Sequence, residues 1–259
     1  MPAEARCHTC GMDHRPRRDQ PYYRDALALV HHLGFGFHAD ACAPGILRLL
    51  DPVRQADGLV VEIGCGSGLL TSYLVDAGLR VIATDASEAM LRLARTHVVG
   101  ATDIRRLTLP DDHIPDADAI VGVGHALNYL DDQAQVEHAL VAMATALRPG
   151  GVMAIDLCDL AWGSARATQP PKVWRTADWA LMTEFSLPTP DRYVREMTTF
   201  VRREDGTWRR DDERHDNVLI DTSLVPDLLA HHGVDATVSS SFGDETLPAG
   251  LVTVIGHKI

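Results

Sequence analysis

The chain has very little lysine and no strongly basic cluster. Its 24 lysine and arginine residues stand against 36 aspartates and glutamates, so the formal net charge is −12 at pH 7. The arginine-rich stretch at residues 15–18 is too short to follow a nucleic-acid backbone. Because proteins that bind phosphate backbones present a basic face, we expect no nucleic-acid partner.

Long apolar runs and an ordered set of cysteines are missing as well. No segment is apolar over the length needed to span a bilayer, and the N-terminus lacks the apolar core of a secretion signal. The five cysteines are odd in number and scattered, which predicts reduced thiols rather than disulfides. These absences predict a cytoplasmic protein without a membrane partner.

A metal site is not predicted either. Cys7 and Cys10 form a single Cys-x-x-Cys pair, and a zinc site there would need two further ligands, for example from neighbouring histidines. Asp156 and Asp159 lie near the end of a predicted strand, and no third ligand is evident beside them.

The most informative segment is an apolar run that ends in three alternating glycines, Gly64, Gly66 and Gly68. This order predicts a strand, a tight turn and a helix. A second apolar run ends in Asp85, about 20 residues downstream, the usual distance for an acid that accepts hydrogen bonds from ribose hydroxyls. The pattern predicts an adenosine-type cofactor at the carboxyl ends of two parallel strands.

The details of the glycine loop favour one cofactor over another. A dinucleotide fingerprint is Gly-x-Gly-x-x-Gly, but here the third glycine comes one residue early, at Gly68, and Leu69 takes its place. The carboxylate of Glu62 is poorly placed for a pyrophosphate and suits a positive amino group. The loop therefore favours S-adenosylmethionine (SAM) over a nicotinamide dinucleotide.

From these residues onward the sequence resembles the class I SAM-dependent methyltransferases. The glycine loop resembles their first motif, and Asp85 with the residues after it resembles their acidic residue and following helix. Five motifs occur in the family's order, at residues 62–68, 85–91, 103–112, 117–124 and 146–151. The resemblance covers about residues 55 to 160, which is the cofactor half. It implies SAM as cofactor and S-adenosylhomocysteine as its product.

The resemblance also implies how single residues hold SAM. Glu62 would orient the amino group, Asp85 would accept from both ribose hydroxyls, and Met90 would pack near the adenine, unless it is ordinary helix core. Asp103, at the end of the third strand, would accept from the adenine amino group, and Ile104 would cover a ring face. The implied cofactor residues are Glu62, Gly64, Cys65, Gly66, Gly68, Asp85, Ala86, Met90, Asp103, Ile104 and Gly122.

Alternating apolar and helix-like stretches predict an α/β fold. We expect a doubly wound, Rossmann-like mixed sheet of about seven strands with helices on both faces. Residues 1–54 would form a polar tail and a helical cap, and residues 55–259 the SAM-binding domain. The expected strands are 59–64, 80–85, 101–104, 118–123, 151–157, 235–242 and 250–257, and the expected helices 21–32, 39–50, 68–77, 87–97, 133–147 and 222–231.

A β-rich insertion at about residues 173–220 interrupts this rhythm. Its three runs, 173–186, 193–203 and 208–220, are separated by turn-forming residues and predict an antiparallel sheet. In small-molecule methyltransferases of similar layout, such an insertion roofs the acceptor pocket. Alternatively it is a structural flap or the contact of a homodimer.

His125 is the candidate catalytic base, because it follows the fourth predicted strand at its carboxyl end and imidazole titrates near neutral pH. Alternatively His125 only makes local hydrogen bonds. The candidate acceptor-binding residues are Tyr22, Tyr23, His38, Trp162 and His215.

The sequence thus predicts a SAM-dependent methyltransferase that acts on nitrogen, oxygen or carbon of a small molecule. The fourth strand is not followed by the Asn/Asp-Pro-Pro-aromatic pattern associated with nucleobase or amide nitrogen methylation. Two alternatives stay open: a non-catalytic SAM-binding protein that acts through partners, and an NAD(P)-dependent reductase.

Overall fold

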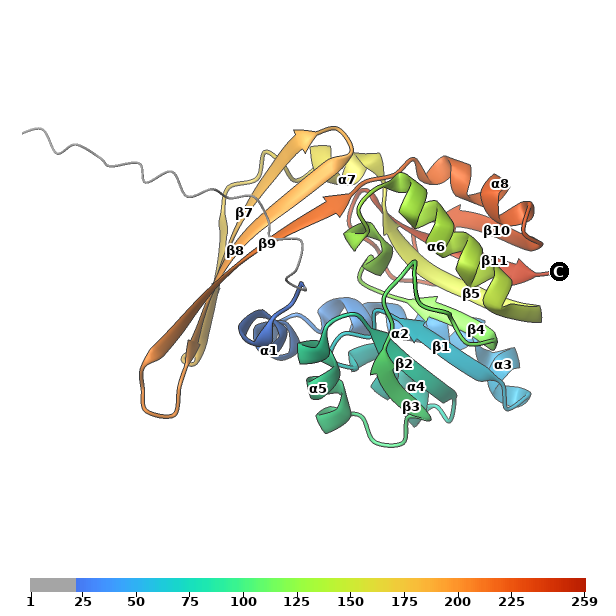
Figure 1. The fold of residues 1–259 in the computed structure, drawn as a ribbon, viewed down its shortest axis with the longest axis horizontal. Coiled ribbons are helices and arrows are strands. Elements are labelled where there is room, and N and C mark those ends of the chain that lie inside the picture. Colours follow the sequence, from blue (N-terminus) through green and yellow to red (C-terminus); the bar gives the residue numbers. More distant parts are fainter. Residues whose placement is uncertain (1–21) are drawn as a thin grey trace, which may run out of the picture.

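The computed structural model describes residues 22–259. The predicted polar tail, with Cys7 and Cys10, lies outside the described residues. Figure 1 shows a sheet flanked by helices and a narrower antiparallel sheet that extends away from it.

A seven-stranded mixed sheet forms the centre of the larger part. Its strands are β1 (Leu59–Ile63), β2 (Arg80–Asp85), β3 (Asp103–Arg106), β4 (Ala117–Gly122), β5 (Leu147–Cys158), β10 (Val234–Ser239) and β11 (Leu251–Lys258). They lie in the order β10-β11-β5-β4-β1-β2-β3. The first five in sequence are parallel, whereas β11 is antiparallel to β5 and β10. The expected mixed sheet is confirmed.

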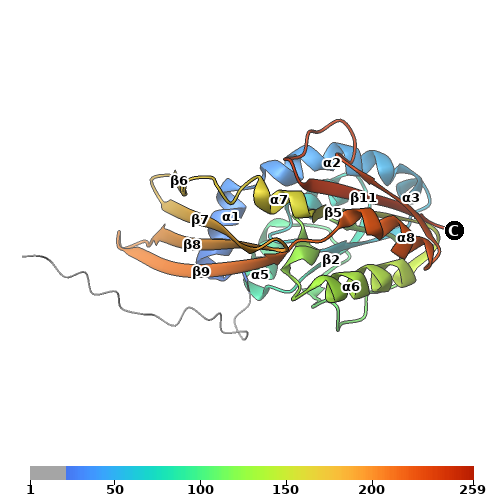
Figure 2. The same cartoon turned by 90° about the horizontal axis from the view of Figure 1, so that it is seen from above.

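Helices cover both faces of this sheet, as expected. They are α1 (Asp25–Gly34), α2 (Phe37–Leu49), α3 (Asp51–Gln55), α4 (Leu69–Asp76), α5 (Glu88–His97), α6 (Gln133–Ala146), α7 (Leu160–Ser164) and α8 (Val225–Ala230). Figure 2 shows α2 and α3 on one side of the sheet and α6 on the other.

The central strands are apolar on both faces because each face packs against helices. In β1, Val60 joins a buried cluster with residues of α2 and α4. Its neighbour Val61 points the other way and joins a cluster with residues of α6 and α8. A strand buried on both sides needs an almost continuous apolar sequence, and residues 59–63 have one with Glu62 as the exception.

The insertion is a four-stranded antiparallel sheet, β6 (Lys172–Arg175), β7 (Trp179–Thr189), β8 (Arg192–Arg202) and β9 (Trp208–Val218). The expected first run is two strands, because Thr176 ends β6 with a tight turn. Its hydroxyl accepts hydrogen bonds from the amides of Asp178, at 3.2 Å, and Trp179, at 3.1 Å.

Helix α1 fastens the insertion to the main sheet. Leu27 and Val30 of α1 are buried against Trp179, Leu181 and Met197 of the insertion. Figure 1 shows α1 between the two sheets, beside the middle of the long strands. Of the helices in residues 22–259, none combines the length and apolar character needed to cross a membrane.

Candidate active site

The three glycines of the loop after β1 have different surroundings. A Cβ on Gly64 would lie 2.4 Å from the Cβ of Ala126, and one on Gly68 would lie 2.4 Å from Val98 of the segment after α5. A Cβ on Gly66 would meet nothing closer than the sulfur of Met90, at 4.0 Å. Gly64 and Gly68 therefore serve close packing, whereas Gly66 leaves open space where its backbone can approach a ligand.

Asp85 joins the glycine loop to the turn after β2. Its carboxylate accepts hydrogen bonds from the amides of Gly66, at 2.8 Å, and Ser87, at 2.7 Å. Burial raises the pKa of this carboxyl group, and the two amides act in the opposite direction. Each carboxylate oxygen has a second lone pair, so Asp85 can still accept from ribose hydroxyls.

Glu62 lies beneath the loop as a buried carboxyl group. Among residues 22–259 its carboxyl group has one hydrogen-bond partner, the hydroxyl of Thr71 in α4, which donates to Oε2 at 2.6 Å. Burial raises the pKa of Glu62 to about 7. No ion pair involves Glu62 among residues 22–259, so a cationic ligand group would compensate its charge. Together with the open face of Gly66 and with Asp85, this residue fits SAM.

The side chains of the other implied cofactor residues are partly turned away from the loop. Cys65 packs with Ala83 and Leu91, so it can reach a ligand only through its backbone. Met90 is buried beside Gly66, and Ala86 is exposed. These positions leave the loop backbone as the principal contact surface.

Gly122 ends β4 where that strand passes close to β1. A Cβ there would lie 2.9 Å from the carbonyl oxygen of Ile63. The residue therefore serves the close approach of two strands and does not face open space.

The third strand was expected at residues 101–104, with Asp103 and Ile104 at its end, and these bounds are wrong. Strand β3 starts at Asp103 rather than ending near it, and Arg106 is the residue paired with Asp85. Asp103 forms a 3.6 Å ion pair with Arg105, while Ile104 packs against the Cys65 cluster. The error arose because the strand lies two residues later than the apolar pattern indicated. The carboxyl end of β3 is formed by Arg106 and Leu107.

The N-terminal segment lies across the ends of β1 and β2. His32 of α1 is hydrogen-bonded through Nδ1 to the hydroxyl of Ser67, at 2.9 Å. The hydroxyl of Ser87 donates to the carbonyl of Tyr23, at 2.8 Å. The segment thereby covers both the glycine loop and the turn that carries Asp85.

Asp156 of β5 organises the loop after β4. Its carboxylate accepts from the amides of Gly124, at 3.0 Å, and His125, at 2.6 Å, and pairs with Nε2 of His38, at 2.7 Å. Burial acts to raise the pKa of Asp156, but the contact with His38 and the backbone donors outweigh it, so the pKa is lowered. His38 is thus engaged by Asp156, a pairing that no local sequence pattern indicates.

His125 adopts a left-handed backbone conformation, with φ of 51°, at the start of the 3-10 helix η1 (Ala126–Tyr129). Its Nδ1 is enclosed and has no partner among residues 22–259. Burial, and next the charge of Arg195, lower the pKa of His125 to about 3. The imidazole is therefore neutral at pH 7 and can accept or donate one hydrogen bond at Nδ1.

Six ring side chains form a continuous cluster around His125. Neighbouring ring centres lie 4.7–5.8 Å apart. In spatial order the rings are Trp162, His125, Tyr129 and His215, followed by Tyr22 and Tyr23. We call this set the ring cluster. It brings together five of the six predicted catalytic and acceptor-binding residues, and His38 is the exception.

Two residues of this region, Tyr129 and Arg195, were not predicted from the sequence. Tyr129 donates or accepts a 2.9 Å hydrogen bond with the hydroxyl of Tyr23, and Arg195 of β8 donates to the hydroxyl of Tyr129. Tyr129 could have been found from its place four residues after His125. Arg195 lies in a regular strand of alternating pattern, and nothing in the sequence distinguishes it from the other arginines of the insertion.

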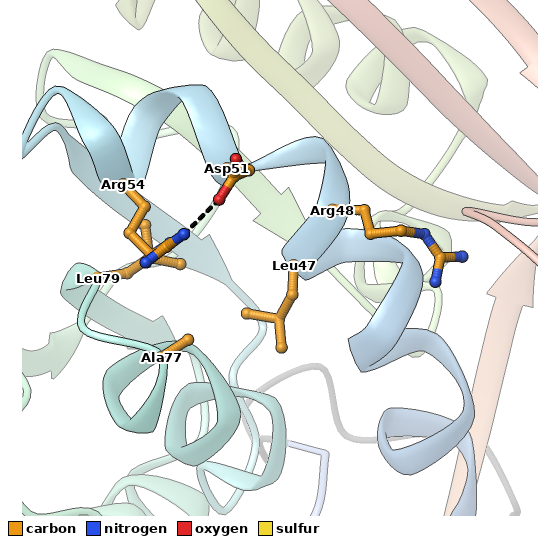
Figure 3. Close-up of a pocket in the computed structure, with 6 residues that line it drawn as sticks. All are labelled: Leu47, Arg48, Asp51, Arg54, Ala77 and Leu79. Carbon is orange, nitrogen blue, oxygen red and sulfur yellow. Dashed lines mark hydrogen bonds and ion pairs between the residues drawn. The ribbon is translucent and has the colours of Figure 1, made fainter.

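A surface cleft lies far from these residues. It is lined by residues of α2, α3 and the α4–β2 turn, which directly precede β1 and β2 and so lie at the opposite end of the sheet from the glycine loop. Figure 3 shows Asp51 and Arg54 paired across its rim, with Arg48 pointing away. This small cleft has no buried polar group that would direct chemistry, and we assign no function to it.

Replacement of Glu62 by glutamine tests the buried carboxyl group. An unfolded glutamate ionises near pH 4.5, whereas folded Glu62 holds its proton until about pH 7. Between these values the free energy of unfolding falls as the pH rises, because only the folded chain keeps the proton. Glutamine does not titrate. Between about pH 5 and about pH 8, the free energy of unfolding should therefore fall less in the variant than in the wild type, and the difference should reach up to about 3 kcal/mol.

Urea unfolding at the two pH values measures this difference. Glu204→Gln, in an exposed turn of the insertion, is the control and should follow the wild-type pH dependence. If Glu62→Gln also follows it, the carboxyl group of Glu62 does not titrate near neutral pH.

Comparisons with known proteins agree with this geometry. The family model described as "Methyltransferase domain" matches residues 60–151. The ubiquinone biosynthesis O-methyltransferase of Stutzerimonas stutzeri is 26% identical over 201 residues, which is 75% of this chain and 80% of the relative.

Two solved structures show a similar fold. The sugar N-methyltransferase KedS8 from Streptoalloteichus has a TM-score of 0.73 at 21% identity, covering 95% of this chain and 99% of the other. DesVI from Streptomyces venezuelae has a TM-score of 0.74 at 17% identity, covering 91% and 98%. With the glycine loop, Asp85 and Glu62 arranged as described, residues 60–151 form a SAM-dependent methyltransferase domain.

Proposed function

We propose that the chain transfers the methyl group of SAM to a small molecule held by the ring cluster. The observation that carries the proposal is the joining of this cluster to the cofactor loop. Ala126, which directly follows His125, packs against Gly64, and the carbonyl of Tyr23 binds Ser87 beside Asp85. The acceptor and the cofactor would therefore occupy adjoining spaces at the carboxyl ends of the strands, where ligands of open α/β sheets bind.

Bound SAM supplies an electrophilic methyl group on a sulfonium. The protein must then hold the acceptor atom in line and exclude water. The ring cluster is suited to this, because its members come from four separate parts of the fold, the N-terminal segment, η1, α7 and the insertion, and present several aromatic faces in one place. An N–H or O–H acceptor also has to lose a proton.

We propose that Nδ1 of His125 accepts a hydrogen bond from the acceptor and takes its proton. The nitrogen is enclosed and unpartnered among residues 22–259, and its loop is fixed by Asp156. Because burial and Arg195 hold the pKa near 3, His125 is a weak base. Its contribution then lies in orienting the acceptor as much as in removing the proton.

The relatives support a small acceptor without fixing its reacting atom. One relative is an O-methyltransferase of ubiquinone biosynthesis, and one structural neighbour is a sugar N-methyltransferase. A cytoplasmic setting is supported by the three described cysteines, which are buried free thiols. We retain the division of the chain into a polar tail and helical cap at residues 1–54 and a SAM-binding domain at residues 55–259. The insertion sheet has two edge strands, β6 and β9, at which a second copy of the chain could pair to form a homodimer.

Thermal unfolding with candidate cofactors tests the function directly. At about 100 times the dissociation constant, SAM and S-adenosylhomocysteine should each stabilise the fold by about 2.7 kcal/mol, while NAD and NADP should not. Production of S-adenosylhomocysteine is then followed with a panel of phenols, amines and acids. Stabilisation by NADP alone would contradict the cofactor, and SAM binding without turnover on any acceptor would favour the non-catalytic alternative.

Replacement of His125 by glutamine should lower kcat by about 10²-fold, the lower end of the range for a positioned base, and leave S-adenosylhomocysteine affinity unchanged. Since its pKa is about 3, His125 is already deprotonated at physiological pH, so its titration should produce no change in kcat/KM between about pH 5 and about pH 8. His138→Gln, on the exposed side of α6, is the control. A wild-type rate loss centred near pH 6.5 that disappears in His125→Gln would refute the lowered pKa, and unchanged kcat would remove the catalytic role.

A further inference from the structure

Two guanidinium groups contact the ring cluster: Arg166 lies over the ring of Trp162, 3.2 Å from its centre, and Arg195 lies at Tyr129. The second lies deeper among the imidazoles. Arg195 lies on β8 directly opposite the fully buried His215 of β9, so both side chains lie on the same face of the insertion. The guanidinium donates to the hydroxyl of Tyr129 and, at 3.4 Å, to Oδ1 of Asn217. It remains protonated at any pH the enzyme meets.

Within residues 22–259, none of the partners of Arg195 is anionic. Its Nε is enclosed and unpartnered, and it forms no ion pair with a carboxylate among residues 22–259. Burial raises the pKa of Tyr129 well above its usual value, so its hydroxyl is neutral. The contrast with Arg214 on the next strand is direct, since Arg214 pairs with Glu196 and Asp216, each at 3.0 Å.

The nearby carboxylates are already engaged elsewhere. Glu213 accepts from the amides of Tyr23 and Arg24, each at 2.8 Å, and pairs with Nε2 of His215 at 2.9 Å. Asp156 is held by His38 and by the loop amides. The charge of Arg195 therefore has no protein counter-ion in the ring cluster.

The three imidazoles around Arg195 do not balance its charge either. Burial, and next the charge of Arg195, lower the pKa of His31 to about 4 and that of His125 to about 3, and they lower that of His215 well below its usual value. All three are neutral at pH 7, and each has an enclosed Nδ1 without a partner among residues 22–259. Arg195 is thus surrounded by neutral rings and by three unpartnered ring nitrogens, with no anion among the described residues beside it.

An uncompensated charge in such a place is costly unless a ligand pairs with it. We propose that Arg195 binds a carboxylate of the methyl acceptor, so that the acceptor is an organic acid. A carboxylate matches the charge and the planar fork of one guanidinium, whereas a phosphate monoester would bring about two negative charges. The surrounding rings suit an acid with an apolar body. The inference rests on the proposed function, because it names the class of molecule that the ring cluster holds.

Binding of small acids tests the assignment without requiring turnover. The protein saturated with S-adenosylhomocysteine is titrated by calorimetry with benzoate, 4-hydroxybenzoate and acetate, and with the amide of each. At least one acid should bind about ten to a hundred times more tightly than its amide, as expected for a charge-assisted contact. Phenyl phosphate distinguishes a carboxylate site from a phosphate site.

Arg195→Gln should abolish the preference for acid over amide while leaving the affinity for S-adenosylhomocysteine unchanged. Arg214→Gln, which removes an arginine of the same sheet that already has carboxylate partners, should preserve the preference. Should Arg195→Gln fail to fold, Arg195→Lys keeps the charge but loses the fork. It should still prefer the acid, by a smaller factor than the wild type.

Three results would overturn the proposal. The first is equal binding of every acid and its amide to the wild type, and the second is binding of phenyl phosphate without binding of any carboxylate. The third is a loss of S-adenosylhomocysteine affinity in Arg195→Gln, which would assign the guanidinium to the cofactor's own carboxylate. In each of these cases, thermal unfolding of the wild type is also measured with S-adenosylhomocysteine. If S-adenosylhomocysteine stabilises the wild type, the proposed methyl transfer stands although the acid-binding role of Arg195 fails.

Discussion

The carboxylate of Asp156 is the point on which the site depends. Its side chain, on β5, is buried. It accepts hydrogen bonds from two backbone amides of the loop after β4 and pairs with the imidazole of His38. Those amides lie beyond the end of β4, and buried amides without partners would be costly. The carboxylate thereby stabilises the left-handed conformation of His125, which costs about 1–3 kcal/mol where it is unsupported.

The position of this loop determines how the other parts of the molecule meet. Ala126 packs against Gly64 of the cofactor loop. Two residues later, the buried amide of Asn128 bonds to the backbone of Cys158 in both directions and donates to the carbonyl of Val218, the last residue of β9. One short segment therefore contacts the cofactor loop, the central sheet and the base of the insertion. His38 adds the N-terminal helices through the same carboxylate.

Much of the cofactor half could be predicted because local sequence determines it. Strands buried on both faces need continuous apolar runs, and the glycine loop and Asp85 follow them at fixed spacing. The exception is Asp103, where a four-residue strand gave too weak a pattern to fix its boundaries. The acceptor side was predictable only in part. His125, Tyr22, Tyr23, Trp162 and His215 were selected from residue type and position, and the structure brings these five into one cluster.

The remaining contacts depend on tertiary structure, which no local pattern records. Arg195 has the alternating neighbours of any strand residue, and only the pairing of β8 with β9 brings it to the cluster. The pairing of His38 with Asp156 joins residues 118 positions apart in the chain. Such interactions form when elements far apart in the sequence pack together. At these positions the sequence shows only that a residue type able to bind or react is present.

A crystal structure with bound S-adenosylhomocysteine would test most directly whether cofactor and acceptor spaces adjoin at this loop. The account predicts the ribose on Asp85, the amino group directed to Glu62, and the thioether sulfur facing the space bounded by His125, Tyr129 and Arg195. A sulfur directed away from the ring cluster, with the cluster closed off from the ligand, would contradict it.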